Sequence, residues 1–211
     1  MFNTNSIKTS NFFKTALNEL ELTAMRKTLL TSIATFIADE LKEKRTVNLN
    51  FICTHNSRRS QLSQVWAQYA IEYYKLSNIH SFSGGTEETA FFSNTVKTLQ
   101  EVGFEFHVQK FSHQNPVYEI HADLFKAPLI GFSKLYDHTI NQKPFIAITT
   151  CNNADENCPF IPDTVKRFHL PFVDPKASDN EPNTMEVYKN TSKTIAGELS
   201  FVFKTVKTLV G

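Results

Sequence analysis

Apolar residues recur with two different periods along this chain of 211 residues. Short apolar runs at 47–52, 79–83 and 145–148 are typical of buried strands, and 167–170 is a weaker candidate of the same type. Between these runs, apolar residues recur three and four positions apart, which is typical of helices. Strands that alternate with helices indicate an α/β fold built on a small, doubly wound parallel sheet of about four strands.

Three helices are expected between and after these strands. The first follows strand 47–52 and has large apolar residues on one face, namely Leu62, Val65, Trp66, Tyr69 and Tyr73. The second covers residues 93–102 and is capped by Gly103, a residue type that is common just after the end of a helix. The last has apolar residues that step by four and three, namely Ile195, Leu199, Val202, Val206 and Leu209.

Two segments lie outside this regular alternation. Residues from about 16 to 44 have the apolar spacing of a further helix, carried by Leu22, Met25, Leu29, Ile33, Phe36 and Leu41. We therefore divide the chain into a helical extension over 1–45, which packs on the core or on a partner chain, and an α/β domain over 46–211. Residues 112–143 contain Pro116 and Pro128 and show no sustained period, so we expect loop with short elements there.

Composition narrows the range of functions. The chain has 22 lysine and arginine residues against 21 aspartate and glutamate residues, so no strong field indicates binding to nucleic acid or to an anionic membrane. No run of about 18 apolar residues is present, and the N-terminus lacks the apolar centre of a signal peptide. We therefore expect a cytoplasmic protein. Three cysteines, an odd number in a reducing compartment, favour reactive thiols over a disulfide framework.

The strongest chemical signal directly follows the first strand. A loop that joins a strand to a helix gathers backbone N–H groups, and the N-terminus of the helix favours negative charge. Cys53 at this point is favoured as a thiolate, and the guanidinium of Arg59 suits a bound oxyanion. Ser60 can donate a hydrogen bond to the thiolate. The pattern predicts a nucleophile inside an anion-binding loop, which is formed by Thr54, His55, Asn56, Ser57, Arg58, Arg59 and Ser60.

A second pair of cysteines follows the strand at 145–148. Because ligands of a doubly wound sheet bind at the carboxyl ends of its strands, Cys151 and Cys53 are expected at one edge, close enough to react. Cys158 follows after a polar and acidic segment that we expect to be a mobile loop or turn. Six residues between the two cysteines, with no second pair, fit zinc poorly, so we expect no metal and no cofactor. A redox pair is favoured over structural cysteines.

Asp174 and Pro175 form a third candidate feature. An aspartate that a following proline holds in place, on a loop after a strand, can serve as a general acid over the anion-binding loop. An Asp-Pro pair alone is a weak signal, since it is common in ordinary turns. The two cysteine features that precede it favour the general-acid interpretation here.

These three features, in this order, resemble the low-molecular-weight tyrosine phosphatases and, within that fold, the thioredoxin-coupled arsenate reductases. Cys53, Arg59 and Asp174 match the catalytic residues of the phosphatase family, and the resemblance covers residues 46–208. Cys151 and Cys158 match the second and third redox cysteines of the reductases, which ordinary phosphatases lack. One departure is His55, which stands where the family usually has glycine.

The resemblance implies an arsenate reductase. Cys53 would attack the oxyanion, while Cys151 and Cys158 would pass a disulfide on to thioredoxin. The alternative is a tyrosine phosphatase that forms a phospho-cysteine and acts on a phosphate ester. That alternative is weakened by Lys176, Ala177 and Ser178, which follow Asp174-Pro175 where the phosphatases usually have tyrosines. A third reading is a redox-sensing module without catalytic activity.

Overall fold

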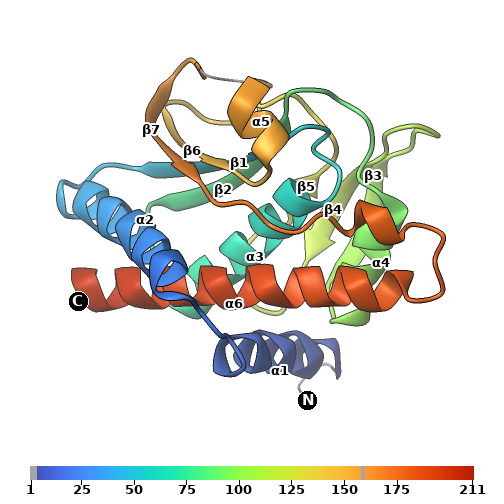
Figure 1. Cartoon of the computed structure of the whole chain (residues 1–211), viewed down its shortest axis with the longest axis horizontal. Coiled ribbons are helices and arrows are strands. Elements are labelled where there is room, and N and C mark those ends of the chain that lie inside the picture. Colours follow the sequence, from blue (N-terminus) through green and yellow to red (C-terminus); the bar gives the residue numbers. More distant parts are fainter. Residues whose placement is uncertain (1–3, 158–159) are drawn as a thin grey trace.

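The computed structural model describes residues 4–157 and 160–211 (Figure 1). At its centre lies a four-stranded, fully parallel sheet in the order β2-β1-β6-β7, as the sequence pattern predicts. The four strands are β1 (Val47–Cys53), β2 (Ile79–Gly85), β6 (Phe145–Thr149) and β7 (Thr164–His169). Strand β1 is central, and the chain leaves it for β2 on one side and later returns to β6 on the other. This reversal of strand order makes the carboxyl end of β1 the expected site of ligand binding.

Helices cover the sheet on both faces. The helices of the chain are α1 (Thr4–Asn18), α2 (Ala24–Lys42), α3 (Arg59–Tyr73), α4 (Ser93–Glu101), α5 (Asn152–Asn157) and α6 (Thr184–Val210), with a 3₁₀ helix, η1 (Pro175–Ser178). The long helix α6 runs below the sheet in Figure 1, with α3 between them, while α5 lies on the opposite side. Helix α4 ends at Glu101 with Val102 as its C-cap, and Gly103 follows with a φ of 108°, which is unstrained only for glycine, so the predicted role of Gly103 at this helix end is confirmed.

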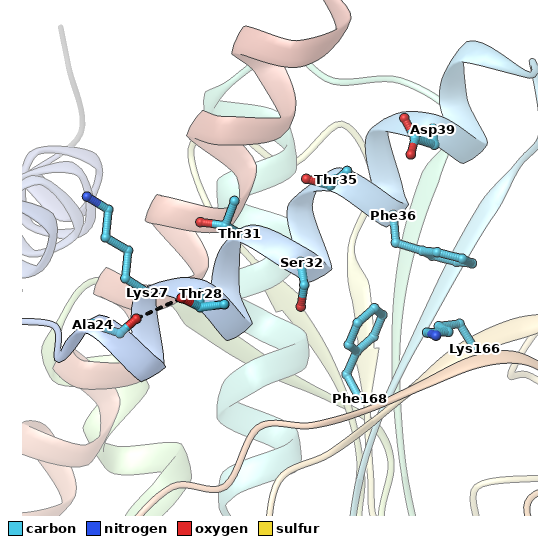
Figure 2. Close-up of a pocket in the computed structure, with 10 residues that line it drawn as sticks. All are labelled: Ala24, Lys27, Thr28, Thr31, Ser32, Thr35, Phe36, Asp39, Lys166 and Phe168. Carbon is cyan, nitrogen blue, oxygen red and sulfur yellow. Dashed lines mark hydrogen bonds between the residues drawn. The ribbon is translucent and has the colours of Figure 1, made fainter.

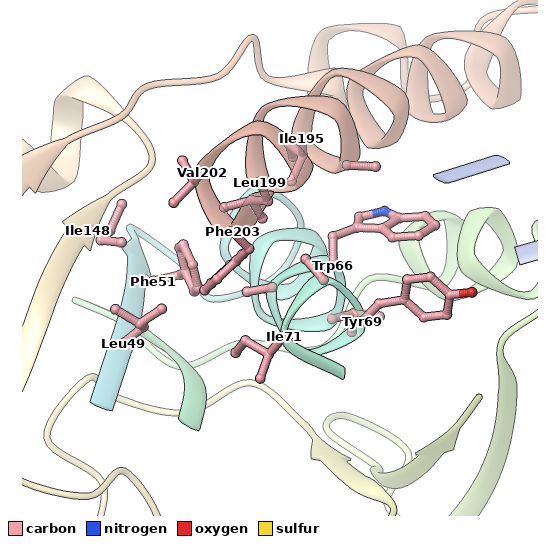
Figure 3. Close-up of a cluster of buried hydrophobic side chains, with 14 of the residues drawn as sticks. Leu49, Phe51, Trp66, Tyr69, Ile71, Ile148, Ile195, Leu199, Val202 and Phe203 are labelled. Carbon is pink, nitrogen blue, oxygen red and sulfur yellow. The ribbon is translucent and has the colours of Figure 1, made fainter. Parts of the chain in front are cut away.

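The main core lies between the sheet and helices α3 and α6. Figure 3 shows the apolar side chains of the two helices interlocking over β1. Trp66, Tyr69, Leu199 and Val202 of the predicted apolar faces are buried in this core, whereas Leu209, near the end of α6, is exposed. A second, smaller cluster on the other face contains Cys53 and lies beneath α5.

The region 112–143 contributes two short strands to a second sheet. A separate antiparallel sheet forms from β3 (Glu105–Lys110), β4 (Val117–His121) and β5 (Leu129–Gly131). Residues 112–143 are therefore loops with two short strands, as expected. The pairing of these strands into a sheet was not predicted, because they are short, mostly half-exposed and carry no apolar run. Pro116 and Pro128 each directly precede a strand. Proline has no N–H group to donate, and just before a strand this loss removes no hydrogen bond between strands. The two prolines therefore mark strand boundaries.

The N-terminal segment forms two helices, whereas the pattern predicted one. Helix α2 begins after Thr23, whose hydroxyl accepts a hydrogen bond from the backbone N–H of Arg26 and thereby caps the helix. Buried residues of both helices, such as Phe13 and Ile33, belong to the same core as the sheet. Of the two expected alternatives, the core or a partner chain, both helices pack on the core, and both contact α6. No helix among the described residues is long and apolar enough to cross a membrane.

A buried ion pair fastens α2 to α6. The guanidinium of Arg26 donates two hydrogen bonds to the carboxylate of Glu198, at 2.9 and 2.7 Å. Burial raises the pKa of Glu198, whereas Arg26 opposes that rise by stabilising the charged form. Arg26 also donates to the carbonyl of Pro171 and lies over the ring of Phe172. Helix α2 thus contacts the segment that leads to Asp174.

We expect Arg26→Met to lower the free energy of unfolding by about 3–5 kcal/mol, because it leaves the Glu198 carboxylate buried without its partner. Urea denaturation followed by circular dichroism measures this loss. The control is Arg45→Met, which removes an ion pair between Arg45 and Glu40 at an exposed position and should leave the denaturation midpoint unchanged. Equal shifts for the two variants would contradict this account of the Arg26 pair.

Candidate active site

The predicted anion-binding loop surrounds a small cavity of about 20 Å³ at the carboxyl end of β1. The loop, residues 53–59, leaves β1 at Cys53 and enters α3 at Arg59. Seven residues line the cavity, namely Cys53, Thr54, His55, Ser57, Arg58, Arg59 and Asp174. The structure thus brings together most of the residues that sequence analysis assigned to binding and to chemistry. We call residues 53–59 the Cys53 loop.

Asn56 and Ser60, the other two residues of the predicted anion-binding loop, lie behind the nucleophile. The Sγ atom of Cys53 lies 3.0 Å from the hydroxyl of Ser60, which in turn accepts a hydrogen bond of 2.9 Å from the amide of Asn56. Because the Ser60 oxygen is already an acceptor, its proton can point at Cys53. This arrangement places a hydrogen-bond donor at the sulfur of Cys53. Asn56 has a φ of 46°, a left-handed conformation that asparagine tolerates better than most residues.

Gly85 allows the loop to pack directly on the end of β2. It pairs with Cys53 in the parallel register. A Cβ atom at this position would lie 2.7 Å from the carbonyl oxygen of Thr54 and 2.9 Å from the nitrogen of Asn56. The second glycine, Gly84, is equally restricted, because its Cβ would lie 2.2 Å from the Cα of Tyr136. Gly85 therefore lets the Cys53 loop approach β2 closely, and Gly84 does the same for the segment at Tyr136.

Arg59 and Asp174 meet at the mouth of the cavity. One Nη atom of Arg59 lies 2.5 Å from a carboxylate oxygen of Asp174, and the other donates to the carbonyl of Phe172 at 3.2 Å. The second carboxylate oxygen of Asp174 accepts from the N–H of Lys176 and caps η1. The predicted general acid and the predicted oxyanion ligand are thus in direct contact.

Arg58 joins the loop to the segment that follows Asp174. Its guanidinium donates to the hydroxyl of Tyr188 and to the carboxylate of Asp179, both at 2.6 Å, and lies 3.9 Å above the ring of Phe92. The two neighbouring arginines therefore hold opposite ends of the Asp174–Asp179 segment. Sequence analysis proposed Arg58 only as an anion ligand and did not find these three partners, which are far from it along the chain.

His55 turns toward the rim of the cavity. Its Nε2 atom lies 3.3 Å from the carboxylate of Glu87, and its backbone carbonyl accepts from Ser133 and Thr89. The backbone of the loop is therefore held at the position where the related families usually have glycine. The imidazole pairs with Glu87 at a half-exposed position.

Cys151 lies beside the Cys53 loop, as the strand order predicts. The two cysteines are free thiols that belong to one buried apolar cluster. The Sγ atom of Cys151 lies 3.6 Å from the hydroxyl of Thr54, the residue that follows Cys53, and accepts a hydrogen bond from the N–H of Ala154. A second thiol is therefore available next to the nucleophile. Cys158 lies outside the described residues.

The segment between the two later cysteines forms a helix, α5, so the expectation of a loop or turn was wrong. Asp155 holds this helix on the sheet, since it accepts from the hydroxyl of Thr149 and from the guanidinium of Arg167, both at 2.7 Å. Burial opposes the charged form of Asp155, but these hydrogen bonds outweigh burial and lower its pKa. These polar side chains serve as anchors of α5.

No family model matches this chain. In sequence it is similar to the arsenate reductase of Bacillus subtilis (strain 168), with 29% identity over 159 residues that cover 74% of this chain and 95% of the relative. It is also similar to arsenate reductase 2 of Staphylococcus epidermidis, with 29% identity over 133 residues, or 63% of this chain and 80% of the relative. The resemblance to the arsenate reductases is confirmed.

Solved structures match the fold. A YwlE mutant from Bacillus subtilis has a TM-score of 0.54 at 16% identity and covers 76% of this chain and 99% of its own. A YwlE arginine phosphatase with a phosphorylated active-site serine has a TM-score of 0.53 at 16% identity, covering 75% and 95%. The predicted fold class, that of the low-molecular-weight phosphatases with N-terminal helices added, is confirmed. At this level of identity the two structures establish the fold alone.

A larger hollow is remote from this chemistry. It has a volume of about 880 Å³ and lies between α2 and β7, where Figure 2 shows Phe36 and Phe168 at one end and a row of hydroxyl groups along the helix. It shares no residue with the cavity at Cys53. Within residues 4–157 and 160–211, no group of three or more potential metal ligands is gathered.

Proposed function

We propose that this protein is a thiol-dependent arsenate reductase, with Cys53 as nucleophile and Cys151 and Cys158 as a disulfide relay. The observation that carries the proposal is the position of Cys151, a second buried thiol that contacts the Cys53 loop through Thr54. A hydrolase of this kind needs water after the first step, whereas a reductase needs a thiol. The sequence similarity to arsenate reductases supports the same conclusion.

Binding of arsenate would exchange one anion for another at Arg59. With Asp174 on the guanidinium, the cavity of about 20 Å³ leaves little room for a tetrahedral oxyanion. Arsenate therefore displaces the carboxylate of Asp174 and takes both Nη atoms, while its remaining oxygens face the backbone N–H groups at the start of α3. The displaced carboxylate stays at the mouth of the site, where it takes up a proton from the entering dihydrogen arsenate and can return it to the leaving oxygen.

The first chemical step forms a bond between the Cys53 sulfur and arsenic. An oxygen of arsenate leaves as water, and Asp174 supplies a proton to it. The thiolate of Cys151 then attacks the sulfur of Cys53. The new disulfide forms as the sulfur–arsenic bond breaks, and the bonding electron pair stays on arsenic. Arsenic is thereby reduced from the +5 to the +3 state and leaves as arsenite, while the two thiolates are oxidised.

Transfer of the disulfide outward would restore the nucleophile. Cys158 as thiolate attacks Cys151, which releases Cys53 and forms a Cys151–Cys158 disulfide. A dithiol protein of the thioredoxin type would then reduce this disulfide and complete the cycle. Because Cys151 is buried under α5, we expect the anchors of this helix at Asp155 to release during the relay.

The second candidate function is a phosphatase of the same fold, which needs only Cys53, Arg59 and Asp174. This second function is supported by the fold, which the chain shares with an arginine phosphatase. An aromatic substrate would require an apolar wall at the cavity, yet the residues after Asp174-Pro175 are not aromatic. The ring of Phe92 is covered by Arg58. A weak activity on phosphate esters is still expected, since arsenate and phosphate share the same geometry.

Parallel assays on the full-length protein separate the two functions. Arsenite release is measured with thioredoxin, thioredoxin reductase and NADPH, and phosphate release is measured with a phosphotyrosine peptide, a phosphoarginine peptide and para-nitrophenyl phosphate. We expect kcat/KM for arsenate to exceed that for each ester, with Cys53→Ser inactive on all substrates. Rapid ester hydrolysis without detectable arsenite would overturn the proposal in favour of the phosphatase.

A further inference from the structure

A lysine is buried beneath the Cys53 loop. The side chain of Lys134 is only 1% exposed, and its Nζ atom lies 3.4 Å from the hydroxyl of Ser83 and 4.9 Å from the centre of the Phe132 ring. Within the described residues, no carboxylate forms an ion pair with it. A buried ammonium group without an opposite charge is costly, so its presence calls for a role beyond packing.

The main chain of Lys134 holds the loop from below. Its N–H donates a hydrogen bond of 3.0 Å to the side-chain oxygen of Asn56, and its carbonyl accepts from the N–H of Gly85 at 2.8 Å. From Asn56 the hydrogen bonds continue through Ser60 to the sulfur of Cys53. Lys134 is therefore the first residue in a series of hydrogen bonds that ends at the sulfur of Cys53.

Through Ser83, the ammonium group also connects this series of hydrogen bonds to helix α3, which begins at the end of the loop. Ser83, its partner, donates a hydrogen bond of 2.6 Å to the amide oxygen of Gln64 on α3. Ser83 also lies two residues before Gly85, the partner of Cys53 in the register, so the charge lies on the order of 10 Å from the thiol. Ser83, which contacts the ammonium group, and Gln64, the partner of Ser83, are polar but do not ionise near neutral pH.

We propose that Lys134 is a positioning residue of the Cys53 loop, whose buried positive charge favours an anion there, either the Cys53 thiolate or a bound oxyanion. The inference deepens the proposed function, because it names the residue that supports anion binding at the proposed catalytic loop. Burial lowers the pKa of Lys134 to about 7, so its charge is sensitive to a nearby anion. By linkage, an anion in the loop and a proton on Lys134 stabilise one another.

The test compares Lys134→Met with the wild-type protein. Methionine keeps an unbranched chain of similar length over Phe132 but removes the charge. The rate of alkylation of Cys53 by iodoacetamide is measured against pH, with mass mapping of each cysteine, in the presence and absence of inorganic phosphate. We expect the pH midpoint of alkylation to rise by about one unit and protection by phosphate to weaken about tenfold, as expected for a charge at this distance.

Two further variants separate charge from packing. Lys134→Arg keeps the charge and should retain the wild-type midpoint to within a few tenths of a unit. Lys143→Met removes an exposed lysine that pairs with Asp163 and should change neither quantity. An unchanged midpoint and unchanged phosphate protection in Lys134→Met would overturn the inference, whatever the stability of that variant.

A measurement on the wild-type protein covers the case in which Lys134→Met does not fold. The ¹³Cε resonance of Lys134 is titrated with and without saturating inorganic phosphate. Linkage predicts a higher titration midpoint when phosphate is bound, and identical midpoints would overturn the inference. All of these measurements need no arsenate turnover, so failure of the proposed reductase activity and failure of the role of Lys134 give different results.

Discussion

With thioredoxin as the sole reductant, Cys158→Ser is expected to release arsenite once per chain and then stop. The first two steps need only Cys53 and Cys151, which lie together in one buried cluster beside the loop. Without Cys158 the disulfide between these two residues stays buried, out of reach of a protein reductant. Steady-state arsenite production should therefore fall by on the order of a hundredfold or more, while the first turnover persists.

Rapid-quench measurement of arsenite, together with NADPH consumption by thioredoxin reductase, separates the burst from the steady state. The matched variant is Cys151→Ser, which should show no burst, because no thiol is left to attack the Cys53 adduct. In both variants the alkylation rate of Cys53 should stay near that of the wild type, which shows that the loop is intact. Undiminished steady-state reduction by Cys158→Ser would rule out the relay.

Arg59→Lys is expected to lower kcat/KM for arsenate by about 10²–10³-fold, although the charge is kept. Only the planar guanidinium can contact Asp174 and the carbonyl of Phe172 at the same time. The same pair of Nη atoms is required to bind two oxygens of the oxyanion. A lysine replaces this fork by a single point charge. Initial-rate kinetics over a range of arsenate concentrations measure the effect.

The neighbouring arginine provides the control for this variant. Arg58→Lys also keeps a charge in the loop but loses the contacts with Tyr188, Asp179 and the Phe92 ring, so it should alter the position of the segment after Asp174. We expect a loss of about tenfold, smaller than that for Arg59→Lys. A loss in Arg58→Lys equal to or greater than that in Arg59→Lys would contradict the assignment of the two roles.

The parallel sheet and the Cys53 loop could be predicted from the sequence, because both depend on local signals. The buried strands are continuous apolar runs, and the loop residues lie next to one another in the chain. Cys151 could also be placed, since parallel strands end at the same edge of a sheet. The relation of Arg59 to Asp174 followed from the resemblance to known families, and the structure brings the two side chains together.

Features that depend on contacts between distant segments could not be predicted. The strands β4 and β5 have few buried residues and no apolar run, and the helix α5 is held by Asp155 through Thr149 and Arg167. Lys134 gave no signal, because a lysine in an irregular polar segment is normally exposed. Its burial arises only when the segment packs against β2 and the loop.

The most direct test of the proposed relay is a map of the three cysteines after one turnover. The reduced protein is mixed with arsenate in the absence of any reductant, quenched with acid, alkylated and analysed by mass spectrometry, with arsenite measured in parallel. The relay predicts a disulfide between Cys151 and Cys158, a free thiol at Cys53 and one arsenite per chain. Three free thiols and no arsenite, in a preparation that hydrolyses phosphate esters, would contradict it.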